Sequence, residues 1–152
     1  MMDSIPEGSD RDFTASGYVV HHDKVLLLQH DKLGKWLQPG GHIEGEELPH
    51  QTAKREVKEE TGVTTRFQDT PEISYDEPAA DLPQPFNVNA HEINEGHWHC
   101  DFAYKLHVES TGEATHADEH QGTKWFTEDM LRSDEYDLPE NVRKAALKAL
   151  QE

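Results

Sequence analysis

The chain has 152 residues, and 31 acidic residues against 14 basic residues give it a formal net charge of −17. This length suits one domain with its own core, and the acidic surplus argues against binding of nucleic acid through a basic face. No apolar run approaches the roughly 18 residues that a membrane-spanning helix needs. These features point to one small acidic domain.

The composition also bears on location. The first residues are polar and acidic, so we expect no signal peptide, a flexible tail over residues 1–11 and a single domain over residues 12–152. A single cysteine, Cys100, excludes an internal disulfide and is typical of the reducing cytoplasm. The acidic surplus, the few lysines and the low hydrophobicity indicate a protein from a halophile, with an ordinary acidic protein as the alternative.

The first half of the chain predicts short strands around one helix. Residues that favour strands concentrate in four stretches, 13–20, 25–29, 36–37 and 65–68. Pro49 suits the first turn of a helix, and Gly62 suits the left-handed position that ends one, which predicts a helix from Pro49 to Thr61. Ala53 and Val57 lie one turn apart and would pack this helix on a sheet.

The second half predicts a long loop, two strands and two helices. Residues 69–94 contain four prolines among acidic residues, so we expect mostly irregular structure with a short strand at 86–90. Further strands are expected at 97–108 and 123–126, and helices at 127–131 and 139–150. Helices before and after a mixed sheet favour an α/β fold of the α/β/α sandwich type.

The helix expected at Pro49–Thr61 carries an acidic face. Glu56, Glu59 and Glu60 are spaced i, i+3 and i+4, so they share one side of the helix. Like charges at this spacing repel by about 0.2–0.5 kcal/mol per pair. A bound hard cation that takes oxygen ligands, such as Mg2+ or Mn2+, is the simplest reason to concentrate them. A solvated acidic helix face is the alternative.

The segment around this helix resembles the Nudix box, G-x5-E-x7-R-E-U-x-E-E-x-G-U, where U is a bulky aliphatic residue. Every fixed position matches within residues 41–63: Gly41, Glu47, Arg55-Glu56-Val57, Glu59-Glu60, Gly62 and Val63. The resemblance implies a Nudix-type α/β/α sandwich with the box as a loop-helix-loop. It also implies that Gly41, Glu47, Arg55 and Gly62 hold that loop-helix-loop in shape.

The same resemblance implies a Mg2+-dependent hydrolase, with Mn2+ as the alternative ion. The substrate would be a nucleoside diphosphate linked to another group, as in the smaller family members that remove damaged or surplus nucleotides. Glu56, Glu59, Glu60 and the Gly40 carbonyl would be the metal ligands, and Glu56 is a candidate general base. Several family members carry a further catalytic glutamate at a place that corresponds to Glu119; a solvated carboxylate is the alternative there.

Residues outside the box suggest a substrate site. In a strand, His97, His99 and Asp101 face the same side and would line a groove beside the metal helix, or form a half-exposed strand face. Trp36 would stack on a base or pack in the core. Structural zinc is not expected, because no C-x-x-C or H-E-x-x-H spacing occurs.

Two other functions share the expected fold. One is a nucleotide-binding or sensor module without hydrolysis, and an intact box argues against it. The other is an enzyme like isopentenyl-diphosphate isomerase, which the chain resembles poorly because its only cysteine, Cys100, lies outside the box. The expected partner is a small-molecule nucleotide, without a membrane or a nucleic acid, for a monomer or a homodimer.

Overall fold

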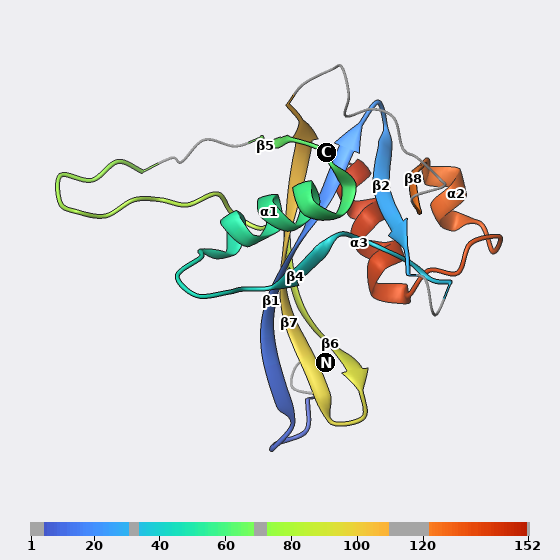
Figure 1. Cartoon of the computed structure of the whole chain (residues 1–152), viewed down its shortest axis with the longest axis horizontal. Coiled ribbons are helices and arrows are strands. Elements are labelled where there is room, and N and C mark those ends of the chain that lie inside the picture. The colour runs from blue at the N-terminus through green and yellow to red at the C-terminus, as the bar shows by residue number, and fades with distance from the viewer. Residues whose placement is uncertain (1–4, 31–33, 69–72, 110–121, 152) are drawn as a thin grey trace.

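The computed structural model describes residues 5–30, 34–68, 73–109 and 122–151. Within these residues, eight strands form one mixed sheet with the central order β3-β2-β1-β7-β5 (Figure 1). Three further strands pair outside that path: β4 with β1, β6 with β7, and β8 with β2.

The described residues form eight strands and three helices. The strands are β1 (Asp10–His21), β2 (Lys24–Gln29), β3 (Trp36–Leu37), β4 (Gly40–His42), β5 (Thr65–Phe67), β6 (Asn87–Asn94), β7 (His97–Val108) and β8 (Thr123–Phe126). The helices are α1 (Pro49–Thr61), α2 (Glu128–Arg132) and α3 (Glu140–Leu150).

The two longest strands, β1 and β7, run parallel through the centre of the sheet, and their register pairs Asp12 with His99 and Thr14 with Asp101. Because side chains alternate along a strand, the even residues of β1 and the odd residues of β7 share one face. The same face includes His42 of β4, which pairs with Thr14. Polar side chains far apart in the sequence are thereby placed side by side.

Helices cover both faces of the sheet, which confirms the α/β/α sandwich (Figure 1). On one face, Ala53 and Val57 of α1 are fully buried in a core with Val19 and Leu106. On the other face, α2 and α3 form a second core with the sheet. Its fully buried members include Leu27, Phe126, Leu131 and Ala146.

The ends of some strands differ from the prediction. β1 begins at Asp10, so residues 10 and 11 belong to a strand and not to a tail, because β1 pairs with the outer end of β7. Local propensity missed this part, since pairing along a sheet outweighs weak strand preference. Gly40–His42 forms strand β4, although Gly-Gly is a poor strand former. A Cβ at Gly40 would lie 2.7 Å from the Ala15 carbonyl oxygen, and glycine permits this close approach.

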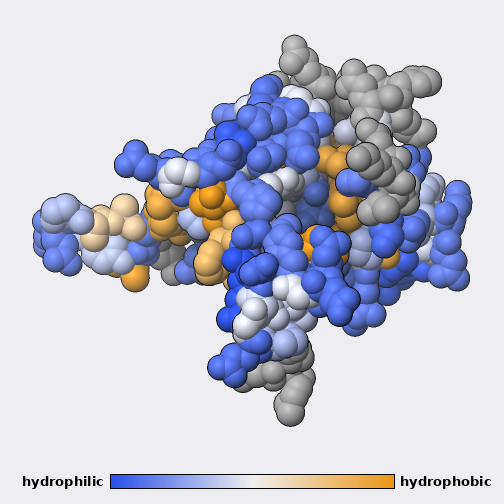
Figure 2. Space-filling view, turned by 60° about the horizontal axis from the view of Figure 1, so that its bottom comes forward, coloured by the Kyte–Doolittle hydropathy of each residue, from blue (hydrophilic) through white to orange (hydrophobic). Residues whose placement is uncertain are grey.

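The face seen in Figure 2 is largely hydrophilic. Hydrophobic residues gather near the base of the segment that projects from the body, residues 73–85 (Figures 1 and 2). This segment is irregular, as expected from its prolines, and it exposes Ile73, Tyr75 and Leu82. Among the described residues, no helix is long and apolar enough to cross a membrane.

The net charge of −17 leads to a prediction about salt. We expect the Tm to rise markedly between dilute buffer and molar KCl, because screening weakens repulsion between like charges. Thermal unfolding followed by circular dichroism measures this, and NaCl is the control, since screening does not depend on the cation. A Tm that does not change with either salt would contradict the halophilic interpretation.

Candidate functional site

The segment before α1 is tied to the helix by one arginine. Arg55 Nε donates to Glu47 Oε2 at 2.6 Å, and Arg55 Nη2 donates to Glu47 Oε1 at 3.0 Å, which makes a two-pronged ion pair. The hydroxyl of Thr52 donates to Glu47 Oε1 at 2.8 Å. The hydrogen bonds from Arg55 and Thr52 lower the pKa of Glu47 to about 2. The carboxylate is therefore ionised at neutral pH and ties the segment before α1 to the helix.

Strand β4 and helix α1 meet through two glycines and two glutamates. The backbone N–H of Gly40 donates to Glu60 Oε1 at 2.8 Å. A Cβ added to Gly41 would lie 2.5 Å from Glu56 Oε2, so the Glu56 carboxylate lies directly against this glycine. Both carboxylates are thus held at the same short strand.

The electrostatics of these carboxylates favour a cation. Desolvation, together with the charges of Glu56 and Glu59, raises the pKa of Glu60 to about 7, although its bond from Gly40 opposes the shift. Desolvation likewise raises the pKa of Glu56, against the attraction of Arg55. Both shifts mean that negative charge gathers here at a free-energy cost. A hard cation fits this place, since every donor is an oxygen atom.

Glu59 differs from the other two glutamates of the acidic face. Its side chain is 58 % exposed, and Arg55 Nη1 donates to Glu59 Oε1 at 2.9 Å. The same Nη1 lies 3.1 Å from Glu56 Oε2. Arg55 therefore connects the structural Glu47 to two of the three expected metal ligands.

A groove of about 420 Å³ opens beside β4, on the sheet face of Asp101. Asp101 is only 5 % exposed, and it accepts hydrogen bonds from Thr14 Oγ1 at 2.8 Å and Ser16 Oγ at 2.6 Å. Gly40 and Gly41 also line the groove, so it adjoins the strand that holds Glu56 and Glu60. The other lining residues include His30, Lys35, Gln38, His42, His91, His99 and Asn141.

A larger cavity, of about 710 Å³, is lined by residues of α1, of β5 and of the segment between them. Its lining includes Lys54, Lys58 and Phe67 but neither Gly40 nor any of the three glutamates of the acidic face. None of the three α1 glutamates lines either cavity, but the smaller groove is lined by Gly40 and Gly41 of β4, against which Glu60 and Glu56 pack.

The residues expected to bind substrate are only partly together. His99 and Asp101 line the groove. His97 lies outside its lining and contacts Asp12, with Nε2 2.7 Å from Asp12 Oδ2. Trp36 packs edge-on against Phe126 at a ring separation of 5.2 Å, which favours a core role over stacking on a base. Glu119 lies outside the described residues.

Sequence reasoning missed several groove residues. Thr14, Ser16 and His42 reach the site through the pairing of β1 with β7 and β4. Thr14 and Ser16 follow the ordinary alternation of a strand, and no sequence spacing connects them to His42. Lys35 also lines the groove, but a lone lysine in a loop carries no signal in the sequence.

Comparisons with known proteins agree with this geometry. The family model described as NUDIX domain matches residues 11–150. A crystal structure of a NUDIX-family hydrolase from Clostridium perfringens superposes with a TM-score of 0.70 at 31% identity, covering 93% of this chain and 97% of that chain. A NUDIX hydrolase from Nitrosomonas europaea superposes with a TM-score of 0.64 at 22% identity, covering 92% of this chain and 88% of that chain.

One similar protein carries a name that states a reaction. The probable DHNTP pyrophosphohydrolase of Lactococcus lactis subsp. cremoris (strain MG1363) is 36% identical over 100 residues, which are 66% of this chain and 56% of the relative. The chain thus spans little more than half the length of this relative. The similarity covers about two thirds of this chain and not the whole of the other protein.

Proposed function

The chain belongs to the Nudix family, and on this premise we propose that it is a divalent-metal-dependent pyrophosphohydrolase. Its substrate is a nucleoside diphosphate linked to another group. The observation that carries the proposal is the placement of Glu56 and Glu60 against Gly41 and Gly40, at the border of the groove. A pyrophosphohydrolase among the relatives supports the kind of reaction.

The metal site of the proposal comprises Glu56, Glu59, Glu60 and the Gly40 carbonyl, with Mg2+ preferred and Mn2+ as the alternative. The all-oxygen donor set and the raised pKa values of Glu56 and Glu60 support this assignment. When bound, the ion supplies positive charge to the phosphate oxygens and acidifies a water molecule.

The residues of the chain would position the reacting groups and take up the proton of the attacking water. In our proposal, Glu56 accepts the proton of the attacking water, since its carboxylate is partly buried and its pKa is raised. Arg55 and Glu47 keep Glu56 in place through their ion pair. Glu119 is the alternative base, and it lies outside the described residues.

The groove would hold the rest of the substrate. Asp101, with two hydroxyl donors beside it, has the oxygen acceptors to bind an N–H group of a base, and Lys35 would attract a phosphate. A single cysteine supports a place in the cytoplasm. A sensor module that binds without cleavage is the rival function.

A substrate panel tests the proposal. The full chain is incubated with Mg2+ and (d)NTPs, oxidised dNTPs, DHNTP, ADP-ribose, NADH, dinucleoside polyphosphates and nucleotide sugars, and the products are separated by chromatography. We expect cleavage of a diphosphate bond in at least one compound and none after chelation of the metal. Binding of a nucleotide without any cleavage would support the sensor module instead.

The raised pKa of Glu60 predicts how metal affinity depends on pH. A protonated carboxyl must lose its proton before it can bind a cation, so Mg2+ affinity should increase as the pH rises through about 7. Without metal, the folded state holds this proton more tightly than the unfolded state. Stability should therefore fall as the pH rises from the ordinary value of 4.5 through about 7.

Calorimetric Mg2+ titrations at several pH values measure this effect, with the Glu60→Gln variant as control. The variant should bind Mg2+ weakly at every pH and should lose most of the pH dependence. An affinity of the native chain that stays constant from about pH 6 to 8 would exclude Glu60 as a ligand that must first lose a proton.

A second prediction separates binding from chemistry in the groove. His99→Ala should raise KM more than it lowers kcat, because His99 lines the groove and lies outside the carboxylate cluster at β4. Steady-state kinetics with Mg2+ measure both constants. His22→Asn is a matched control at an exposed turn, where φ is 50° and asparagine is tolerated. A loss in kcat at constant KM would place His99 in the chemical step.

A further inference from the structure

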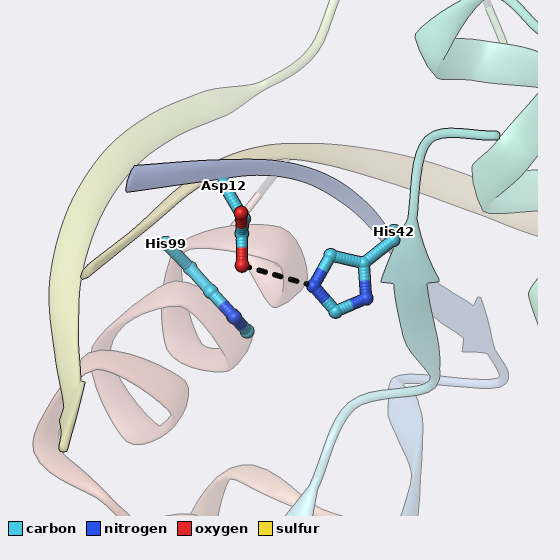
Figure 3. A group of neighbouring side chains, drawn as sticks. All are labelled: Asp12, His42 and His99. Carbon is cyan, nitrogen blue, oxygen red and sulfur yellow. Dashed lines mark hydrogen bonds and ion pairs between the residues drawn. The ribbon is translucent and has the colours of Figure 1, made fainter. Parts of the chain in front are cut away.

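A second group of metal-ligating side chains lies on the sheet face of Asp101, opposite the face that α1 covers. It is formed by Asp12 of β1, His42 of β4 and His99 of β7, which point toward one another (Figure 3). One ligand atom from each residue lies within 4.8 Å of the other two. His42 Nε2 is 3.4 Å from Asp12 Oδ2, and this contact is the dashed line in Figure 3.

The donor set differs from that of helix α1. Two imidazole nitrogens and one carboxylate oxygen suit Zn2+, Co2+ or Ni2+, whereas Mg2+ prefers oxygen atoms alone. Bonds of about 2.0–2.2 Å in a tetrahedral site would place the ligand atoms roughly 3.3–3.6 Å apart. The ligand atoms already lie within 4.8 Å of one another, so only a small closure is needed. The side chain of His42 is 58 % exposed and has room to turn.

The surroundings of the group support a metal site in a second way. His97 Nε2 lies 2.7 Å from Asp12 Oδ2, so His97 can donate a hydrogen bond to this carboxylate. Metal-bound carboxylates are commonly held by such outer hydrogen bonds.

The group also borders the groove. His42 and His99 belong to its lining, so an ion on them would face the groove and keep a position for water or for a ligand in it. This arrangement could not be predicted from the sequence, because residues 12, 42 and 99 come together only through the register of three strands. The absence of compact zinc spacings therefore does not argue against it.

We propose that Asp12, His42 and His99 form a binding site for one transition-metal ion of the zinc class, with His97 as the hydrogen-bond partner of Asp12. Its donor residues differ from those of the site proposed for Mg2+, which are Glu56, Glu59, Glu60 and the Gly40 carbonyl. Ordinary hydrogen bonding between strands is the rival explanation for the group, and metal titration distinguishes the two.

The experiment uses the full chain, without an affinity tag and after treatment with a chelator. Zn2+ binding is measured by calorimetry, and Co2+ binding by visible absorption, whose intensity distinguishes tetrahedral from octahedral coordination. We expect one equivalent of Zn2+ and an intense Co2+ spectrum. His99→Ala and His42→Ala should each weaken binding at least about 100-fold, and His97→Ala about 10-fold, since it removes only an outer contact.

Two control variants make the assignment specific. His22→Asn removes a histidine outside the group, and Glu59→Gln removes a carboxylate of α1; both should keep the Kd for Zn2+. Circular dichroism confirms that each variant is folded. The proposal is overturned if His42→Ala and His99→Ala bind Zn2+ as the native chain does, or if Glu59→Gln alone abolishes binding. The readout is independent of hydrolysis, so it does not depend on the proposed function.

Discussion

Replacing Glu60 by glutamine is expected to lower kcat at limiting Mg2+ at least about 100-fold, since loss even of an outer partner of a metal ligand costs about 10–100-fold. The substitution removes a charge at nearly constant volume, so the fold should persist. Without metal, the Tm of the variant at pH 8 should exceed that of the native chain, because the desolvated, mutually repelling carboxylate is gone. Kinetics across a Mg2+ series and thermal unfolding measure both effects.

Two further variants, Glu59→Gln and Glu46→Gln, show whether the effect of Glu60→Gln is specific to the acidic face of α1. Glu59→Gln should also weaken activity at limiting Mg2+, although Glu59 is exposed and its removal relieves less repulsion. Glu46→Gln is the matched control, since Glu46 is an exposed carboxylate of the same segment. If Glu59→Gln and Glu60→Gln both keep native activity at limiting Mg2+, the acidic face of α1 is a solvated surface and not a metal site.

The two adjacent glycines of β4 should respond differently to alanine. In Gly41→Ala, the new Cβ would lie 2.5 Å from Glu56 Oε2, which is the end of a flexible side chain. Glu56 can move aside, so we expect little change in Tm. Activity should fall about 100-fold, since a displacement of about 1 Å at a catalytic group can cost that much. Kinetics and thermal unfolding of the same preparation measure both.

Gly40→Ala provides the contrast. Its Cβ would meet the Ala15 carbonyl oxygen at 2.7 Å and the Ser16 Cα at 2.9 Å, and both are backbone atoms. Strand β4 would have to move away from β1, which we expect to cost about 1–3 kcal/mol of stability or more. A Gly41→Ala chain with native activity would show that Glu56 does not need its place against Gly41. A Gly40→Ala chain with native Tm would show that β4 is free to shift.

Elements with strong local signals were predictable from the sequence. Helix α1 begins at Pro49 and ends before Gly62, as proposed, because both residues act on the backbone at their own positions. Gly62 has φ 78° and its N–H donates to the Lys58 carbonyl, which is the expected helix end. Strand β7 also has the predicted bounds. The contact of Arg55 with Glu47 could be expected from the box.

Only the β7 part of the groove, His99 and Asp101, could be predicted from the sequence, because the rest of its lining depends on strand register. Asp101 receives hydrogen bonds from Thr14 and Ser16, which are more than eighty residues away along the chain. Strand β4 has a glycine-rich sequence that local preference assigns to a turn. Only its pairing with β1 brings His42 beside Asp12. The local pattern therefore identified the expected metal helix and two groove residues of β7, His99 and Asp101, but not the groove residues of β1 and β4.

The central claim, hydrolysis at a diphosphate bond, is tested most directly by isotope transfer. The chain is incubated with Mg2+ and the compound of the panel that it cleaves fastest, in water enriched in 18O. The masses of the products are then measured by mass spectrometry. The proposal predicts one 18O atom in one phosphate-bearing product, since water attacks phosphorus. Products without 18O in any phosphate, or no product while the nucleotide stays bound, would contradict it.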